Sequence, residues 1–300
     1  MKLLDTFIYH ILKRTPKKVI KAFSKRYVAG FSLNETLQIC KKLNKEGYCI
    51  TLDILGEHTK TLDEANFITN KYLALLETIS RKNINANISV KPSHIGHDLG
   101  IKIFEKNLIK LAEKAESLSN FIRIDMESSK LTDDSISTFK KLSHRFSNLG
   151  IVLQAYLFRS LNDLKKLKNH NLNFRLCKGI YKEPSDIAIQ DKDAINKNYL
   201  KILEYAFLNK IYIGIATHDK SLLLQSYNLI KKLKIPKDNF EFQGLYGVPL
   251  EEWYKNHLKN NYKVRLYLPF GDDWYEYSLR RIKENPNIAK YVIKNLFKIR

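Results

Sequence analysis

The C-terminal part of the chain contains a helical pattern that carries unusual side chains on one face. The pattern from Trp274 to Lys283 predicts a helix that ends ahead of Pro286. Four polar residues recur at spacings that place them on one face of this helix: Tyr277, Arg280, Arg281 and Glu284. Two adjacent guanidinium groups suit a carboxylate or a phosphate, because each offers a planar fork for bidentate hydrogen bonds. A solvated basic face with a surface pair between Arg280 and Glu284 explains the pattern equally well.

Two further segments place charged or polar groups where a β-rich run ends. In FRLCKGIY, Arg175 interrupts an apolar run, and Lys178 and Gly179 follow it. A buried guanidinium is costly without a partner, and an anion or an electron-rich ring nitrogen of a cofactor would be a natural one. In IATHD, Thr217 and His218 lie between a β-rich run and a helical pattern, where backbone N–H groups favour a phosphate.

A metal site is a competing interpretation of the histidines. His94 and His97 form a His-x-x-His pair in KPSHIGHD, but no third ligand follows at a diagnostic spacing, so ordinary loop histidines explain the pair better. A metal-dependent barrel hydrolase that uses both histidines with Asp125 and His218 stays open as an alternative. The chain has neither GxGxxG after its first strand nor GxxxxGK[ST], which leaves a Rossmann dinucleotide site and a P-loop unsupported.

Short β-rich runs alternate with longer helical patterns, and these elements must position the residues above. Eight runs predict strands: Tyr48–Leu52, Ala86–Val90, Phe121–Ile124, Ile151–Leu153, Phe174–Cys177, Tyr212–Ala216, Phe240–Phe242 and Val264–Leu268. Helical patterns lie between them, such as Leu62–Ile79, Leu131–Phe146, Ala194–Phe207 and Leu222–Leu233. A parallel pair of strands needs a crossover of a dozen or more residues, so this order predicts an α/β fold and a (β/α)8 TIM-like barrel.

A polar residue lies at or just beyond the C-terminal end of each predicted strand. These residues are Asp53, Lys91, Asp125, Gln154, Lys178, His218, Gln243 and Tyr267. In a barrel the C-terminal strand ends converge on one face, where active sites are built. Any one of them is explained as well by solvation of the rim, but eight in register predict a site.

Composition limits the class of protein. The chain has 300 residues, 44% of them hydrophobic, so it can bury a large core, and disorder is excluded as its main state. Cys40, Cys49 and Cys177 are odd in number and form no CxxC pair, which argues against a disulfide framework and fits a reducing compartment. No stretch approaches the roughly 20 apolar residues that a membrane-spanning helix needs. We therefore expect a cytoplasmic protein, with peripheral contact at the inner face of the cell membrane as a further expectation.

An excess of basic residues predicts anionic partners. The 52 lysines and arginines outnumber the 31 aspartates and glutamates, and the net charge of +21 suits nucleic acid, an acidic membrane surface or a charged substrate. Residues 1–30 carry eight basic residues against one acid, with apolar residues at helical spacing. A basic amphipathic helix of this kind suits an anionic membrane surface. A lysine-rich solvated surface is the plain alternative, and a nucleic-acid-binding protein is a second alternative function.

Several segments together resemble the motifs of the proline dehydrogenase family. In chain order they are LDILGE, SVKPS, IRIDME, VLQAY, RLCKGIY, ATHD, EFQGLYG and YSLRRIKEN. They cover about residues 27–290 in the family's order, so they are specific together, although each is weak alone. The chain is similar to the monofunctional bacterial members and to the proline dehydrogenase domain of proline utilisation A.

The resemblance implies a distorted (β/α)8 barrel with extra N-terminal helices and bound FAD. We accordingly divide the chain into a basic amphipathic N-terminal helical arm, residues 1–30, and a single barrel, residues 31–300. The implied reaction is oxidation of L-proline to Δ1-pyrroline-5-carboxylate, the first step of proline catabolism to glutamate. Hydride would pass from proline C5 to flavin N5, and the electrons would then pass to a membrane quinone. The implied partners include a separate pyrroline-5-carboxylate dehydrogenase, but neither a metal nor nucleic acid.

The resemblance also assigns the substrate site. It places Lys91, Arg280 and Arg281 on the proline carboxylate, which agrees with the argument from the paired guanidinium groups. Tyr267 and Tyr277 would pack against the pyrrolidine ring. The tyrosine at position 267 favours proline over hydroxyproline, because a bulky ring leaves little room at C4 of the substrate.

The cofactor site follows from the same resemblance. Asp125 would anchor the substrate cluster, and Arg175 would lie beside flavin N5 and stabilise the charge that develops on reduction. The flavin ring, ribityl chain and phosphates are assigned to Gln154, Cys177, Lys178, Gly179, Thr217, His218 and Gln243. Glu57 resembles the acid that pairs with Arg280 to close the site against water.

Two residues depart from the family pattern. Ile180 stands where alanine is usual, which could crowd the flavin or substrate side of the turn that begins with Gly179. Asp219 replaces the usual asparagine and puts a carboxylate near the phosphate or adenine end of FAD. Neither change removes a residue assigned to chemistry, so activity is still expected.

Overall fold

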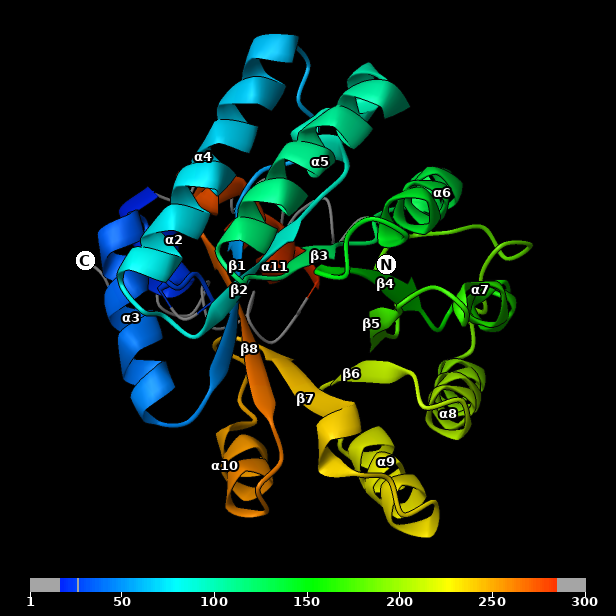
Figure 1. Cartoon of the computed structure of the whole chain (residues 1–300). Helices are drawn as coiled ribbons and strands as arrows, with labels where there is room; N and C mark the ends of the chain where they lie inside the picture. Colours follow the sequence, from blue (N-terminus) through cyan, green and yellow to red (C-terminus); the bar gives the residue numbers. More distant parts are fainter. Residues whose placement is uncertain (1–16, 26, 285–300) are drawn as a thin grey trace, which may run out of the picture.

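The eight predicted strands form one closed parallel barrel, which confirms the predicted fold class (Figure 1). The computed structural model describes residues 17–25 and 27–284, with the side chains of residues 280–284 outside the description. The strands are β1 (Cys49–Ile54), β2 (Ala86–Val90), β3 (Ile122–Ile124), β4 (Leu149–Gln154), β5 (Asn173–Cys177), β6 (Tyr212–Ala216), β7 (Phe240–Leu245) and β8 (Val264–Phe270). Pairing of β1 with β8 closes the barrel.

Helices connect consecutive strands and form an outer ring. The described helices are α2 (Lys17–Ser24), α3 (Leu33–Lys45), α4 (Leu62–Arg81), α5 (Ile101–Ser117), α6 (Thr132–Ser143), α7 (Ser160–Leu167), α8 (Lys192–Leu208), α9 (Lys220–Lys232), α10 (Glu251–Lys259) and α11 (Trp274–Glu284), of which α2 and α3 precede β1 and α11 follows β8. Short 3-10 turns occur at Ser93–Ile95, His97–Leu99, Ser129–Leu131 and Lys237–Asn239. Helices α3 and α4 begin with capping boxes, in which Ser32 or Thr61 accepts a backbone N–H and the glutamate three residues later accepts one in return.

The N-terminal and C-terminal helices differ from the repeating unit. Helix α3 precedes β1 and fills the place in the ring between α10 and α4, and Figure 1 draws α11 inside the ring. Helix α2 packs against α11, and the hydroxyls of Ser24 and Ser278 lie 2.6 Å apart. The segment before the first strand is therefore joined to the helix that follows the last one.

The strands alternate between a polar inner face and an apolar outer face. The outward residues, such as Leu52, Phe174 and Phe242, form one hydrophobic core with the surrounding helices. The inward positions of six strands instead carry polar pairs: Thr51 and Asp53, Asn87 and Ser89, Arg123 and Asp125, Asn173 and Arg175, Glu241 and Gln243, Arg265 and Tyr267. Barrel interiors are usually filled by branched aliphatic residues. A polar interior of this kind requires hydrogen bonds throughout, and these bonds build the site.

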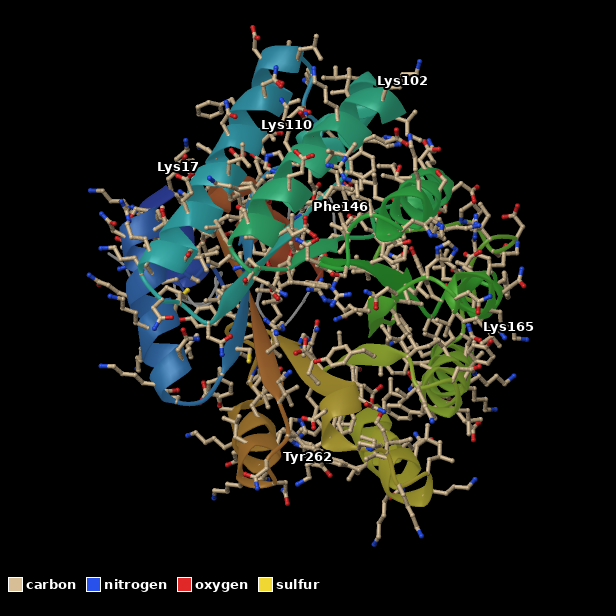
Figure 2. The ribbon with its side chains drawn as sticks, in the orientation of Figure 1. Lys17, Lys102, Lys110, Phe146, Lys165 and Tyr262 are labelled. Atoms are coloured by element: carbon tan, nitrogen blue, oxygen red, sulfur yellow. The ribbon has the colours of Figure 1, made fainter. Side chains whose placement is uncertain are left out.

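The lysine excess lies on the outside of the ring. Lys102 and Lys110 on α5 and Lys165 on α7 are exposed, and Figure 2 shows them on the helical shell, away from the strands. Within the described residues no helix is both long enough and apolar enough to cross a membrane. Of the predicted basic N-terminal arm, residues 1–30, residues 1–16 and 26 lie outside the described residues, and so does the lysine-rich C-terminal stretch 290–300.

Candidate active site

The Asp125 carboxylate joins three strands at the C-terminal end of the barrel. Its Oδ1 accepts hydrogen bonds from Ser89 Oγ at 2.6 Å and from Arg175 Nη1 at 2.7 Å. Its Oδ2 accepts from the Tyr267 hydroxyl at 2.7 Å, and the Arg175 guanidinium lies 4.9 Å from the centroid of the Tyr267 ring. We call these four residues the Asp125 cluster. It brings together Asp125, Arg175 and Tyr267, which the sequence assigned to one site.

A second ion pair lies beside this cluster. Lys91 Nζ is 2.7 Å from Asp53 Oδ2, and the Tyr72 hydroxyl donates to Asp53 Oδ1 at 3.3 Å. Burial alone would lower the pKa of Lys91, but the carboxylates of Asp53 and Asp125 outweigh it and raise the pKa above its usual range. Lys91 is therefore a fixed cation close to the Asp125 cluster, as an anchor for a carboxylate requires.

The ends of β4 and β5 supply groups that a flavin can use. Gln154 is buried, and its Oε1 has no hydrogen-bond partner among the described residues, whereas its Nε2 donates to the Glu127 carbonyl at 3.3 Å. Lys178 and Gly179 follow β5, and Gly179 has a φ of +110°. A Cβ atom at Gly179 would clash with the Tyr156 ring, so only glycine fits this turn.

Cys177, at the end of β5, is a free cysteine. Its Sγ lies 3.7 Å from the Leu153 carbonyl, and burial raises its pKa to about 11. The neighbouring Ile180 is 55% exposed, and its expected crowding of the flavin or substrate side of this turn stays a prediction.

The end of β6 leads into helix α9 through Thr217, His218 and Asp219. His218 Nε2 accepts from the backbone N–H of Leu245 at 3.1 Å. Asp219 caps the helix and accepts the N–H groups of Ser221 and Leu222 through Oδ1. Its Oδ2 is 2.6 Å from Lys178 Nζ, so the Lys178 ammonium balances the added carboxylate. The N–H groups at this helix start, expected to favour a phosphate, are thus partly taken by Asp219.

The histidines of the alternative metal site contact different partners. His94 is buried against Gly56 and the Tyr72 ring, and burial lowers its pKa to about 3. His97 Nε2 is 2.8 Å from Asp134 on α6. Among residues 17–25 and 27–284, no group of three His, Cys, Asp or Glu side chains is arranged to hold a metal ion. The metal-dependent hydrolase therefore has no support in the described part of the chain.

The predicted clamp and gate are only partly described. Tyr277 lies on α11, and the backbone of Arg280 and Arg281 continues this helix as predicted, but their side chains lie outside the described ones. Glu57 lies in the loop after β1, next to Gly56, which packs on the His94 ring. The Glu57 charge acts on the pKa values of Lys91 and Glu127, so this loop borders the site.

Several polar residues of the barrel interior received no functional role from the sequence. Asp53 received no role, although its pairing holds Lys91, and Ser89, Glu241 and Arg265 were not assigned at all. A signal was present for three of them, because Ser89, Glu241 and Arg265 each precede an assigned residue by two positions along the chain. Side chains two apart on a strand point to the same side. The inward position of Asp125, Gln243 or Tyr267 therefore implies an inward partner one step deeper.

Comparison with known proteins shows the family to which this chain belongs. A family model described as proline dehydrogenase matches residues 36–293. The chain is 32% identical to proline dehydrogenase 1 of Bacillus subtilis over 99% of both chains, and 33% identical to proline dehydrogenase of Deinococcus radiodurans over 92% of this chain and 90% of that one. A solved structure of proline utilization A (PutA) from Bdellovibrio bacteriovorus superposes with a TM-score of 0.82 at 27% identity, over 88% of this chain and 33% of that one. The chain belongs to the proline dehydrogenase family.

Proposed function

We propose that this protein oxidises L-proline to Δ1-pyrroline-5-carboxylate with FAD as its bound cofactor. The Asp125 cluster supports this most strongly, because it holds a guanidinium and a tyrosine in fixed positions beside the Lys91 cation at the active-site end of the barrel. Membership in the proline dehydrogenase family is the reason for assigning proline oxidation to this cluster. The reaction starts proline catabolism to glutamate, and a separate pyrroline-5-carboxylate dehydrogenase would take the product.

Proline is held through its carboxylate in this proposal. Lys91, Arg280 and Arg281 bind the carboxylate, and the rings of Tyr267 and Tyr277 pack against the pyrrolidine ring. Fixing the carboxylate fixes the position of C5 in the pocket, which lowers the entropy cost of reaching the reactive geometry. Glu57 and Arg280 close the site above the substrate and exclude water.

The residues at the strand ends fit FAD. The buried Gln154 Oε1 lacks a donor among the described residues, and a ring N–H would supply one. Arg175 Nη2 makes no hydrogen bond within the described residues, although Nε and Nη1 are both engaged. Gln154, Arg175, Cys177, Lys178, Gly179, Thr217, His218 and Gln243 would hold the cofactor. When bound, FAD supplies the hydride acceptor for proline C5, and Arg175 stabilises the negative charge that then develops.

The electron acceptor in this proposal is a membrane quinone, and the enzyme is cytoplasmic with peripheral attachment to an anionic membrane surface. The exposed lysines of the outer helices support the attachment, because each basic residue near such a surface contributes about 1 kcal/mol. Co-sedimentation with anionic vesicles that is lost at high salt would be expected. Equal binding to neutral vesicles would contradict the electrostatic attachment.

The carboxylate clamp gives a direct test of the function. Arg280→Met and Arg281→Met should each raise the KM for proline by roughly 10-fold or more, since each removes one charge-assisted hydrogen bond, while FAD stays bound. Steady-state kinetics with an artificial electron acceptor and the flavin-to-protein ratio measure both effects. Arg145→Met, which changes an exposed arginine on the helical shell, is the control. Loss of flavin with an unchanged KM would show that the two arginines hold the cofactor instead.

A further inference from the structure

Four side chains form a continuous row of hydrogen bonds across the barrel interior: Arg265, Glu241, Gln243 and Arg175, which we call the interior chain. Glu241 Oε1 accepts from Arg265 Nε at 2.7 Å and from Gln243 Nε2 at 2.6 Å. Gln243 Oε1 accepts from Arg175 Nε at 2.6 Å. Glu241 is 1% exposed and Gln243 is 4% exposed, so water does not compete for these bonds. The chain connects the deep layer of the barrel to the guanidinium of the Asp125 cluster.

Glu241 determines which end of the Gln243 amide faces Arg175. An amide has a donor end and an acceptor end, and a rotation by half a turn would direct N–H groups at the N–H groups of Arg175. A carboxylate offers only acceptors, so Glu241 retains the donor end of Gln243. Burial alone would raise the pKa of Glu241, but the cations Arg265 and Arg123 outweigh it and lower the pKa. Glu241 is therefore a carboxylate at neutral pH.

The neighbouring strand leaves room for this amide. Gly214 occupies the inward position on β6, and a Cβ atom there would clash with Gln243 Nε2. The backbone of Gly214 has an ordinary negative φ, so backbone geometry does not demand glycine at this position. The missing side chain serves the position of Gln243.

We propose that Glu241 is a positioning residue for proline oxidation. Together with Arg265 it fixes the Gln243 amide, and Gln243 with Asp125 then holds two of the three guanidinium nitrogens of Arg175 and leaves Nη2 for the cofactor. This inference rests on the proposed function, because that function assigns Arg175 to FAD. The role ascribed to Glu241 is orientation of an amide, and its contribution to stability is separate.

Two variants separate orientation from stability. Glu241→Met/Arg265→Met removes the buried ion pair as a unit, which commonly leaves stability nearly unchanged, but it releases the donor end of Gln243. Glu241→Gln keeps an oxygen that can accept from both neighbours but leaves Arg265 without its counter-charge. We expect the double variant to keep a melting temperature near that of the wild type and to lose kcat by about 10- to 100-fold with an unchanged KM for proline. Glu241→Gln should melt at a lower temperature and keep a kcat close to the wild-type value.

The reduction potential of bound flavin provides a readout besides turnover. A displaced Arg175 stabilises reduced flavin less, so the potential of the double variant should become more negative, while the potential of Glu241→Gln stays near the wild-type value. Thr51→Val is the matched control, since the hydrogen bond of Thr51 to Asn87, 2.6 Å long, lies in the same deep layer but outside the interior chain. This control should leave kcat and potential unchanged.

The outcomes that overturn the proposal are distinct. A double variant that folds, binds FAD and matches the wild type in kcat and potential would refute it, as would a kcat that follows the melting temperature through all three variants. If the double variant does not fold, Glu241→Asp provides the same test, because it keeps the charge and withdraws the acceptor by one methylene group. An unchanged kcat and reduction potential in Glu241→Asp would then refute the proposal. A wild-type protein that binds no FAD would instead contradict the proposed function.

Discussion

Asp125 is the residue on which the geometry of the site depends most. Its two oxygens accept three hydrogen bonds from side chains on β2, β5 and β8. The pair with Arg175 is buried on both sides, and a buried charge whose partner is removed is strongly destabilised. Asp125 therefore fixes the direction of Arg175 and of the Tyr267 hydroxyl at the same time.

Replacement of Asp125 by asparagine tests this role. Asp125→Asn keeps the shape but removes the charge and one acceptor, so Arg175 loses its counter-ion and we expect kcat to fall by about 10- to 100-fold. Ser89→Ala is the control, since it removes one neutral hydrogen bond to the same carboxylate and should cost about 1 kcal/mol of stability with little change in kcat. Steady-state kinetics and thermal denaturation measure both. A wild-type kcat in Asp125→Asn would remove Asp125 from the mechanism.

The sequence predicted single residues of the site better than the hydrogen bonds between them. Arg175 was recognisable, because a guanidinium within an apolar run needs a partner, and Asp125 was recognisable from its place after a strand. The pairing of Arg175 with Gln243 was not, because it depends on how far β5 and β7 are shifted relative to each other. That shift is set by barrel closure and leaves no local pattern in the sequence.

Inward residues that lie two apart along one strand place polar groups at two depths of the barrel interior. On β7, Glu241 lies two residues deeper along the strand than Gln243, and on β8 Arg265 lies two residues deeper than Tyr267. We call the residues nearer the mouth of the barrel the upper layer and the deeper ones the deep layer. Glu241 of the deep layer holds the Gln243 amide of the upper layer through a hydrogen bond. Gly214 on β6 has no side chain and therefore leaves room for the Gln243 amide.

Gly214→Ala should disturb the upper layer without unfolding the protein. The three atoms nearest the new Cβ all belong to the Gln243 side chain, so we expect the amide to move while the backbone stays, and kcat should fall by about 10-fold or more. Gly100→Ala provides the comparison, because a Cβ there meets nothing within 4 Å and its cost is limited to backbone strain at a φ of +135°. Activity at full folding, confirmed by circular dichroism, is the measurement. If Gly214→Ala kept full activity, the position of Gln243 would not matter.

The elements themselves were largely predictable. All eight strands are confirmed, and five of them, β1, β4, β5, β7 and β8, extend one to three residues beyond at least one end of their apolar runs. Strands β1 and β3 begin one residue later than predicted. Several of the extra residues are polar and inward, such as Asp53, Gln154 and Gln243, and apolar patterning alone cannot assign polar positions to a strand. The place of α3 in the ring could not be predicted, because it depends on how the closed barrel leaves a gap beside β1.

At the scale of the whole molecule, charges of both signs are buried inside the barrel and basic charge covers its outside. The interior pairs balance each other, as in Lys91 with Asp53 and Arg265 with Glu241. In the described part of the chain, the excess of basic charge is thus largely a property of the surface. Surface charge of this kind affects partners and solubility more than fold.

Buried neutral histidines make the stability of the fold sensitive to acid. Burial lowers the pKa of His94 to about 3 and that of His257 to about 4, and His257 stacks on Phe242 with ring centroids 3.9 Å apart. The unfolded chain takes up protons near pH 6.5 and the folded chain does not, so the free energy of unfolding falls as the pH drops below that value. Each histidine should cost about 2 kcal/mol by pH 5.

Urea denaturation at pH 7 and pH 5 measures this loss. His257→Gln removes one titrating group and should therefore show a smaller loss between the two pH values than the wild type. An equal loss in both proteins would mean that His257 is not held neutral in the fold.

We propose that the Asp125 cluster serves oxidation of proline by a bound flavin. The decisive measurement is the visible absorption spectrum of the purified protein under anaerobic conditions. The protein should show flavin bands, as purified or after incubation with FAD, and L-proline should bleach them while D-proline at the same concentration should not. A colourless protein that cannot be reconstituted with FAD, or flavin bands that persist in excess L-proline, would contradict the account.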